Sequence, residues 1–483
     1  MSSPIDYLIF QAYNKPKALA LASVEHQLTF QELLVLVKKA ANKFRMAGVL
    51  PGQLAITILP TKFMDWIATL ALMHEGLTTC ACFADNPIDV MPYDWVITSE
   101  SITGVSPEKQ ITLDAAWLSD LNSQSFFIGQ KPLPAPDTPF RLVFTSGTTG
   151  QNKIVAYTQR QVINRAKDYI LAIKHADSLI QLMAQFTSGG IIDGVSHLIT
   201  GTPLFCSTNN ASTIELIKRF SIKSLFGSPM HLTHLIHDLS EQKQSLPSLS
   251  EVYFAGGKIT KTQLEKIKTN LSPNITNMYG STEAGFSTSC RPLMTPNLAV
   301  VGRPHPETQL QIVNNDDQPL PAGQPGQIRV KSSTIVSGYY YPKEVGDDCF
   351  REGWFYPGDM GKILPDGAFE LLGRANELIN RGGIKIDPNQ IDQFLLDYEQ
   401  IQDGAAFAVQ NKEGMMDLAV AIVTREEFDM DKLSHDLLKE LGAHLAPAMI
   451  FKIDAIPRNP MGKVRRFALT TFFNKQLAKK SAD

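Results

Sequence analysis

The sequence predicts an α/β protein with a large N-terminal region of helix-covered, mostly parallel sheets, a small β subdomain and a small α+β C-terminal region. Helix and strand patterns alternate over residues 1–135 and again over 160–285, which is typical of a parallel sheet covered by helices. Short strands separated by Gly, Pro and Asp turns replace this pattern over 299–372. Residues 377–483 then follow a helix, strand, strand, helix order over about 100 residues, a usual domain size.

The N-terminal elements are predicted from capping residues and apolar runs. Thr29 and Glu32 form a capping box, so a helix is expected to begin there and to end near Gly48. The apolar run 55–59 indicates a buried strand, and a helix is expected to follow it at 62–74. A Pro-rich connector at 131–138 then separates these elements from the next loop.

The loop after this connector has the composition of a phosphate-binding site. A short strand at 142–144 leads into small hydroxyl residues and glycines, whose hydroxyls and backbone N–H groups can hold phosphate oxygens. An ordinary polar turn is the alternative. The loop fails the Gly-x4-Gly-Lys-Ser/Thr pattern at two positions, which excludes a P-loop nucleoside triphosphatase. The candidate residues are Thr145, Ser146, Gly147, Thr148, Thr149, Gly150 and Lys153.

A second candidate loop follows the strand pattern that begins at residue 251. Gly256 and Gly257 form a turn after this strand, and Thr260 with Gln263 caps the next helix. In a doubly wound sheet, ligands bind beyond the carboxyl ends of strands. The turn is therefore a candidate ligand site, with a plain strand-to-helix turn as the alternative.

Two further segments carry side chains suited to a nucleotide. Tyr279 could stack on a base, and Glu283 in the same loop is suited to Mg²⁺, which is held through one or two carboxylates. Asp359, in the segment 353–359, could accept a hydrogen bond from a ribose hydroxyl. The alternatives are that Tyr279 belongs to the core, that Glu283 is a solvated charge and that Asp359 serves only a turn.

The C-terminal region is predicted to begin with a helix that Asp387 caps and Pro388 opens. Its buried face is expected to consist of Ile391, Phe394, Leu395 and Tyr398. Strands at 405–410 and 418–423 and a helix at 431–444 follow, and the chain ends in a tail. The tail contains the loop 457–463, whose Lys463 would ordinarily be a solvated charge.

Three histidines recur every third residue on one predicted helix. His231, His234 and His237 follow Ser228-Pro229, a plausible helix start. A metal site is one interpretation, but no further ligand cluster accompanies the histidines. A partly exposed helix face is the simpler alternative.

Composition excludes several classes of protein. The chain has 483 residues with 43% hydrophobic and 19% charged residues, as in a globular protein of two or three domains. A net charge of −3 gives no electrostatic case for nucleic acid or acidic membranes. Five cysteines without a CxxC pair do not make a disulfide framework. No signal peptide or membrane span is visible, and we expect a cytoplasmic protein.

Together, five ordered motifs resemble the adenylate-forming superfamily of acyl- and aryl-CoA ligases, peptide-synthetase adenylation domains and luciferases. The motifs lie at 145–153, 279–283, 354–359, 373–386 and 457–463, so the resemblance covers nearly the whole chain. The resemblance implies a two-step reaction. A carboxylate attacks the α-phosphate of ATP to give an acyl-adenylate and pyrophosphate, and a thiol then takes the acyl group and releases AMP.

The resemblance also implies roles for individual residues. The loop from Thr145 to Lys153 would hold the β- and γ-phosphates, and Glu283 would hold Mg²⁺. Tyr279 would stack on adenine, and Lys463 would bridge the carboxylate and the α-phosphate. The other residues that would contact ATP are Gly256, Gly257, Gly280, Ser281, Thr282 at the α-phosphate, and Asp359 and Arg374 at the ribose. The acyl pocket would use Phe186, Thr187, Gly190, Gly227, Ser228 and Ala255.

Departures from the family pattern concern the acyl pocket and the hinge more than the nucleotide site. The family implies a mobile C-terminal domain, which divides this chain into domains at 1–373 and 377–483 with a hinge at 374–376. The hinge residue is Asn376 where Asp or Lys is usual, and Asn380 replaces a common Lys. Thr187 stands where amino-acid-activating relatives carry Asp, so aryl or medium aliphatic acids are expected. Asp193 lies nearby, and its simplest placement is toward solvent.

The sequence leaves three functions open. The leading prediction is an AMP-forming acid–thiol ligase that uses ATP, Mg²⁺ and CoA. The second is a stand-alone adenylating enzyme that loads the phosphopantetheine of a separate carrier protein. The third, of a different class, is a weakened adenylate-binding protein. The sequence indicates no oligomeric state.

Overall fold

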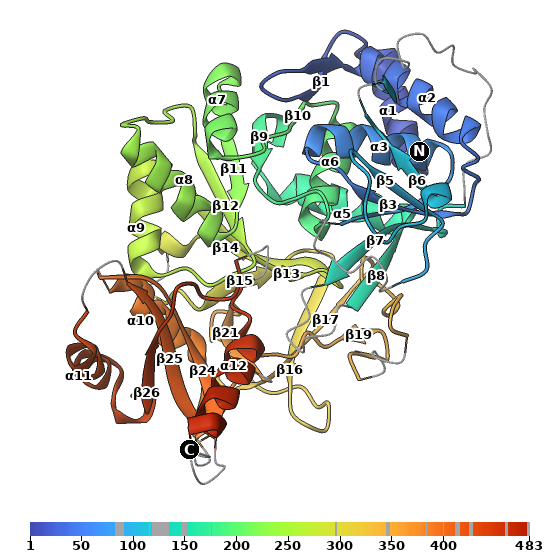
Figure 1. Ribbon diagram of the computed structural model, residues 1–483. Coiled ribbons are helices and arrows are strands. Elements are labelled where there is room, and N and C mark those ends of the chain that lie inside the picture. Colours follow the sequence, from blue (N-terminus) through green and yellow to red (C-terminus); the bar gives the residue numbers. More distant parts are fainter. Residues whose placement is uncertain are drawn as a thin grey trace.

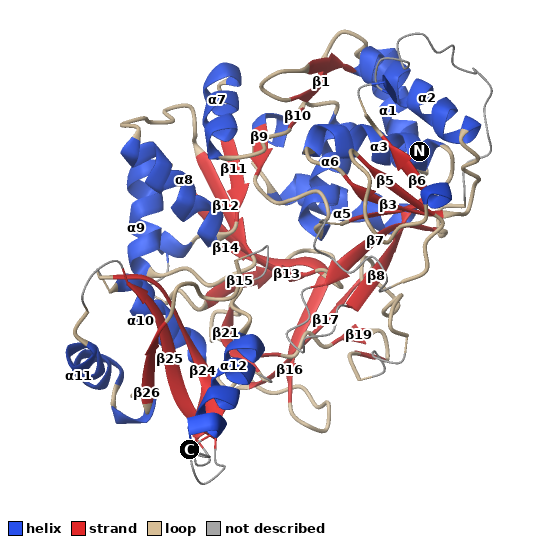
Figure 2. Cartoon of the chain, viewed as in Figure 1, coloured by secondary structure: helices blue, strands red, loops and turns tan. Residues whose placement is uncertain are grey.

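The computed structural model describes most of the chain. It omits residues 83–90, 115, 118–134, 146–152, 175, 295–296, 344–347, 376, 382–383, 399, 411–415, 425–427, 459–461 and 481–483. Two large sheets with covering helices make up the N-terminal part, and a small sheet with its own helices makes up the C-terminal part (Figure 1). Figure 2 shows the helices outside and between the two large sheets.

The first sheet has six strands in the order β6-β5-β3-β4-β7-β8. All neighbours are parallel except the last pair, an antiparallel hairpin of β7 and β8. The prediction of a mostly parallel sheet is confirmed here. The strands are β6 (Gln110–Thr112), β5 (Trp95–Thr98), β3 (Leu54–Ile58), β4 (Thr78–Ala81), β7 (Pro139–Thr145) and β8 (Lys153–Thr158).

The second sheet has twelve strands and changes from parallel to antiparallel along its width. Its parallel strands are β9 (Leu179–Gln181), β11 (Ser224–Gly227), β12 (Glu251–Ala255) and β13 (Ile275–Ser281). The β-rich region expected at 299–372 continues this sheet through β15, rather than standing apart. Its antiparallel strands are β14 (Gly285–Cys290), β15 (Val300–Pro304), β16 (Thr308–Val313), β17 (Gly326–Ser332), β18 (Phe350–Arg351), β19 (Trp354–Phe355), β20 (Asp359–Ile363) and β21 (Phe369–Arg374).

Helices cover both sheets, and α5 packs against strands of each of them. Apolar residues of α2, α3 and α6 share one core cluster with the first sheet, and α7, α8 and α9 share another with β11 and β12. A third, three-stranded sheet of β1 (Leu19–Ala22), β2 (Gln27–Thr29) and β10 (Leu204–Phe205) lies at one end. The helices are α1 (Pro4–Asn14), α2 (Phe30–Met46), α3 (Lys62–His74), α5 (Gln159–Ala172), α6 (Ser188–Thr200), α7 (Asn210–Phe220), α8 (Pro229–Glu241) and α9 (Lys261–Asn270).

Predicted helix starts are confirmed where a capping residue was visible in the sequence. Thr29 and Glu32 form a capping box at α2, and Thr260 and Gln263 form another at α9. In each box a side-chain oxygen accepts from an N–H that the first helical turn leaves unpaired. The strand predicted at 55–59 corresponds to β3, and the helix predicted at 62–74 is α3.

The C-terminal part has a three-stranded sheet of β24 (Ile401–Gln410), β25 (Met416–Thr424) and β26 (Met449–Lys452). Asp387 caps α10 (Pro388–Asp397), as predicted, and α11 (Met430–Leu441) corresponds to the helix expected at 431–444. On α10, Ile391 and Leu395 are fully buried, whereas Phe394 and Tyr398 are half-buried. The short hairpin of β22 (Ile379–Arg381) and β23 (Ile384–Ile386) precedes α10.

No helix or strand was predicted in the tail after residue 444, but the structure contains both there. The tail forms β26 and a C-terminal helix, α12 (Arg466–Lys480). Phe473 of α12 stacks on Phe451 of β26 at a centroid distance of 4.1 Å, so the helix covers one face of the small sheet. Phe467 and Phe472 remain exposed on the same helix. Apolar residues thus point in several directions, which weakens the helical pattern in the sequence.

Candidate active site

The carboxyl ends of four neighbouring strands bring most of the predicted site residues to one edge of the second sheet. In the parallel register, Gly227 pairs with Phe254, and Ala255 pairs with Met278. Gln181 at the end of β9 likewise pairs with Phe226, so the loops after β9, β11, β12 and β13 begin side by side. Since side chains and N–H groups beyond these ends converge, this edge is the expected place for a ligand.

Gly280 shows why the loop after β13 requires glycine. A Cβ atom at this position would lie 2.2 Å from the carbonyl oxygen of Gly285 and 2.8 Å from Cα of Phe286. Because both neighbours belong to the backbone of β14, a side chain could be accommodated only by moving that strand. The close approach keeps the Tyr279–Glu283 segment in position against β14.

Tyr279, Asp359 and Arg374 form one cluster, although 80 residues separate the first two. The Tyr279 hydroxyl donates to Oδ2 of Asp359 at 2.6 Å, and Nε of Arg374 lies 3.2 Å from Oδ1 of Asp359. Asp359 and Arg374 are paired residues on β20 and β21. Burial and the Asp359 charge raise the pKa of Tyr279 well above its ordinary value, so the hydroxyl keeps its proton.

Arg165, which sequence reasoning missed, holds the backbone of the predicted metal-binding segment. Its side chain is buried, and it donates to the carbonyl of Thr282 at 2.7 Å and to that of Glu283 at 2.6 Å. It also donates to the carbonyl of Thr334 at 2.7 Å. Two remote segments are thereby joined to α5 by one guanidinium, whose planar fork suits several acceptors. An arginine within a helix gave no signal of this role.

Two tyrosines complete the surroundings of Thr282 and Glu283. The Tyr157 hydroxyl donates to the Thr282 carbonyl at 2.5 Å, and the Tyr339 hydroxyl donates to Oε1 of Glu283 at 3.0 Å. Glu283 is buried. Nζ of Lys153 lies 4.7 Å from the centroid of the Tyr339 ring, which places the end of the phosphate loop near the carboxylate.

Thr145 and Lys153 are paired at the ends of the hairpin formed by β7 and β8. The predicted phosphate loop is therefore the connection of this hairpin. Ser146, Gly147, Thr148, Thr149 and Gly150 lie outside the described residues, as does Asn376 of the predicted hinge. Their roles stay predictions.

Lys463 comes from the C-terminal part of the chain and reaches the same site. Burial lowers the pKa of its ammonium group, as does the charge of Arg374. Asp359, Glu377 and Glu283 act in the opposite direction. Arg374, Asp359, Glu377 and Glu283 are thus the charged groups that act on Lys463. The structure thus brings together the residues predicted from motifs at 279–283, 354–359 and 457–463.

The loop that carries Lys463 packs on the start of α8. A Cβ atom at Gly462, which has φ of +78°, would lie 2.9 Å from Sδ of Met230. The positive φ favours glycine at this position, and the contact shows that the loop lies directly against Met230. Lys463 therefore lies near Ser228-Pro229, the segment that was predicted to border the acyl group.

The decrease of activity at high pH should report the loss of the positive charge of Lys463. Because the pKa of this group is lowered, it loses its charge at a lower pH than an ordinary lysine, whose pKa is about 10.4. We expect kcat/KM for ATP, which reports the free enzyme, to fall as pH rises through this lowered pKa. In Lys463→Arg, this decrease of kcat/KM should disappear or move to higher pH, because a guanidinium stays charged. An identical decrease in both proteins would assign it to another group.

The predicted acyl-pocket residues lie at the same edge of the sheet, but two of their hydroxyls cap helices. Thr187 caps α6 and accepts from the N–H of Gly190 at 3.0 Å, and Ser228 caps α8. Phe186 is half-buried beside Thr187. The aromatic side chains of Phe226 and Phe286, with centroids 5.8 Å apart, pack together in the core. Whether these residues contact an acid stays a prediction.

The expectation that Asp193 faces solvent is wrong. Asp193 is fully buried on α6, where Nζ of Lys62 lies 3.4 Å from Oδ2 and Nε2 of His197 lies 3.5 Å from Oδ1. Burial alone would raise the pKa of Asp193, but Lys62 and His197 together lower it. Asp193 thus remains charged and is paired within the protein.

Replacing Lys62 with Met should destabilise the fold by about 3 kcal/mol at neutral pH, because it leaves a buried carboxylate with a weaker partner. The loss of stability should become smaller as pH falls and Asp193 becomes protonated. A carboxylate whose pKa is lowered in the folded protein stabilises the fold only at pH values where it is charged. Denaturant unfolding of both proteins at two pH values measures this. Lys268→Met, at an exposed pair with Glu265, is the matched control. A pH-independent difference would mean that Lys62 acts through packing alone.

Among the residues that the structure describes, no further ligand joins the three histidines of α8 in a metal-binding group. His231 lies 3.1 Å from the hydroxyl of Ser228, and burial lowers its pKa, with a smaller contribution from His234. Within the described part of the chain, no group of three or more His, Cys, Asp or Glu side chains is placed to hold a metal ion. The same described residues include no helix long and apolar enough to cross a membrane.

Comparisons with known proteins agree with the motifs. A family described as "AMP-binding enzyme" matches residues 9–340. Tyrocidine synthase 3 of Brevibacillus parabrevis is 26% identical over 95% of this chain, which spans 7% of that much longer protein. Sulfoacetate–CoA ligase of Cupriavidus necator is 27% identical, with 92% of each chain covered. ATP-bound MatB from Rhodopseudomonas palustris, 19% identical, shares the fold with a TM-score of 0.86 over 98% of this chain and 99% of that chain.

Proposed function

Since this chain belongs to the AMP-binding enzymes of the adenylate-forming superfamily, we propose that it activates a carboxylic acid with ATP and passes the acyl group to CoA. The observation that carries the proposal is the convergence of Lys463 with Asp359, Arg374 and Glu283. These residues come from four separate motifs and two parts of the fold. The Lys463 ammonium group, near these carboxylates and the predicted phosphate loop, is suited to stabilise the negative charge that develops when a phosphate is attacked.

Each residue has a role that fits its surroundings. Lys463 would stabilise the charge that develops as the carboxylate attacks the α-phosphate, because it is a mobile point charge beside the reacting atoms. Asp359 would accept from the ribose hydroxyls and is already oriented by Tyr279 and Arg374. Thr282 would contact the α-phosphate, and its backbone is fixed by Arg165 and Tyr157.

Glu283 is suited to bind Mg²⁺ together with the ATP phosphates. It is a buried carboxylate whose backbone and side chain are both held, by Arg165 and Tyr339. Nucleotide-bound Mg²⁺ typically uses only one or two protein carboxylates, so a single Glu fits the ion. When bound, Mg²⁺ would neutralise charge on the phosphates.

An apolar acid is the best-supported substrate class. Thr187 offers no negative charge for an α-ammonium group, and Asp193 is already paired with Lys62. Phe226 and Phe286 lie in the core next to the predicted pocket. We therefore favour aryl or medium aliphatic acids over α-amino acids.

The acceptor and the domain motion complete the proposal. CoA is favoured, with the phosphopantetheine of a separate carrier protein as the second candidate. The domain boundaries at 373 and 377, with a hinge between them, are part of the proposal. The presence of Lys463 together with Glu283, Asp359 and Arg374 argues against a weakened adenylate-binding protein.

Pyrophosphate release with ATP and Mg²⁺, measured across a panel of carboxylic acids with and without CoA, tests the proposal. We expect release that depends on one class of acid, and a CoA-dependent rise in turnover that yields a thioester and AMP. Acid-dependent release that CoA leaves unchanged would transfer the acceptor role to a carrier protein. Absence of release with every acid, from protein that binds ATP, would favour a binding protein.

A further inference from the structure

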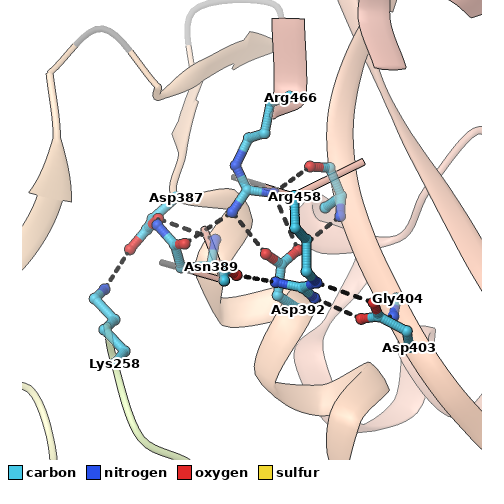
Figure 3. A network of polar contacts seen from close by, with 10 residues as sticks. Lys258, Asp387, Asn389, Asp392, Asp403, Gly404, Arg458 and Arg466 are labelled. Carbon is cyan, nitrogen blue, oxygen red and sulfur yellow. Dashed lines mark hydrogen bonds and ion pairs between the residues drawn. The ribbon is translucent and has the colours of Figure 1, made fainter. Parts of the chain in front are cut away.

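The C-terminal part of the chain is joined to the N-terminal part by a short ion pair next to the candidate site. Nζ of Lys258, directly after Gly256-Gly257, lies 2.7 Å from Oδ2 of Asp387 (Figure 3). The Asp387 side chain is 4% exposed and the Lys258 side chain 23% exposed. A largely buried pair of this kind is more sensitive to the loss of one partner than an exposed pair.

A second contact supports the first at the same place. The Thr260 hydroxyl, two residues after Lys258, donates to Oδ1 of Asp397 at 2.9 Å. Asp387 and Asp397 lie at the two ends of α10. The start of α9 is therefore linked to both ends of one helix, which fixes the direction of that helix relative to the second sheet.

From Asp387, polar contacts continue to the segment that follows Lys463 (Figure 3). Oδ1 of Asp387 accepts from Asn389 at 2.7 Å, and Oδ1 of Asn389 accepts from Arg466 at 2.8 Å. Arg466 also binds Asp392 of α10 at 2.6 Å. Arg466 follows Lys463 by three residues, so α10 anchors one side of the lysine loop.

The other side of the loop is anchored by Arg458. Its guanidinium donates to the carbonyl of Gly462, the residue before Lys463, at 2.7 Å. The same guanidinium binds the carboxylate of Asp403 on β24 at 2.5 and 2.9 Å (Figure 3). Since Lys463 is held between two arginines of the C-terminal part, its place in the active site depends on how that part is seated.

The boundary between the N-terminal and C-terminal parts is not closely packed around the ion pair. A cavity of about 230 Å³ lies at this boundary, lined by Lys258, residues 297–299 and 370–372, and Gln390 and Gln393. Packing across the boundary is therefore incomplete here, and the discrete polar contacts carry more of the attachment.

From these contacts we propose that Lys258 and Asp387, supported by Thr260 and Asp397, are positioning residues that seat the C-terminal part so that Lys463 reaches the reacting atoms. The effect on adenylation rests on the proposed function, whereas the role of these contacts in positioning the C-terminal part does not. The pair would act through the position of Lys463 and not through direct contact with ATP or the acid. It should therefore favour adenylation without serving the later thiol transfer.

Two variants remove the ion pair with little other change. Lys258→Met keeps the aliphatic stem, and Asp387→Asn keeps a residue that can cap α10. Either variant should slow acid-dependent pyrophosphate release roughly threefold to thirtyfold through kcat, with KM for the acid unchanged. The double variant should be no slower than either single one, since both remove one interaction. Thiol transfer from supplied acyl-adenylate should keep its rate, and Lys268→Met on α9 should change neither step.

A distance measurement tests the seating without relying on activity. Spin labels at Lys261→Cys on α9 and Leu438→Cys on α11, both exposed positions, report how the two parts sit, after Cys290 and Cys349 are replaced by Ser. We expect one narrow distance in the parent and a broader or second distance in Lys258→Met. An unchanged distribution in Lys258→Met would overturn the proposal. The distance distribution could change in Lys258→Met although the parent protein shows no acid-dependent pyrophosphate release. That result would support the role of the ion pair in positioning the C-terminal part and reject the proposed function.

Discussion

Lys463→Ala is expected to lower the rate of acid-dependent pyrophosphate release by about 10²- to 10³-fold, the usual effect of removing one group that stabilises developing charge. Lys463 lies in a loop held by Arg458 and Arg466, so the neighbouring backbone should stay in place without the ammonium group. Single-turnover measurements at saturating ATP would isolate the chemical step.

Folding should be unaffected in this variant. Because the charged, desolvated Lys463 has a lowered pKa, its charge costs stability below that pKa, and removing it should not destabilise the protein. Lys475→Ala, at an exposed position of α12, is the matched control. Pyrophosphate release at the parent rate in Lys463→Ala would refute the role assigned to this lysine.

Glu283→Gln is expected to lower the same rate about 100-fold or more and to raise the Mg²⁺ concentration needed for half-maximal activity. The amide oxygen of Gln can still accept from the Tyr339 hydroxyl, which lies 3.0 Å from Oε1 of Glu283. The variant therefore removes the negative charge with little change of shape. Initial rates over a wide range of Mg²⁺ concentrations measure both effects.

Glu265→Gln, at an exposed position of α9, controls for the loss of one carboxylate. A parallel loss of rate at every Mg²⁺ concentration, without a change in the Mg²⁺ requirement, would point to a role of Glu283 in orienting Thr282 and not in binding the ion. An unchanged rate would remove Glu283 from the site.

Local signals in the sequence predicted much of the fold correctly. Thr29 with Glu32, Thr260 with Gln263 and Asp387 with Pro388 all start helices as expected. Each of these signals depends on side-chain and backbone groups within one helical turn. The ordered motifs in turn predicted that Tyr279, Asp359 and Lys463 would meet, since the resemblance carried information about remote contacts.

Features that depend on remote contacts alone were not predictable from local pattern. Arg165 sits within a helix, and nothing near it in the sequence indicates that it holds the carbonyls of Thr282 and Glu283. Asp193 was expected at the surface because its partner Lys62 is 131 residues away. The β-rich region joins the second sheet through β15, a pairing that periodicity within 299–372 cannot reveal.

The most direct test of the central account is the exchange of labelled pyrophosphate into ATP, which reports reversible formation of an acyl-adenylate. We expect exchange that requires both Mg²⁺ and a carboxylic acid in the parent protein, and that falls by the same large factor in Lys463→Ala. Exchange that proceeds equally well in the parent and in Lys463→Ala, or that needs no acid, would contradict it.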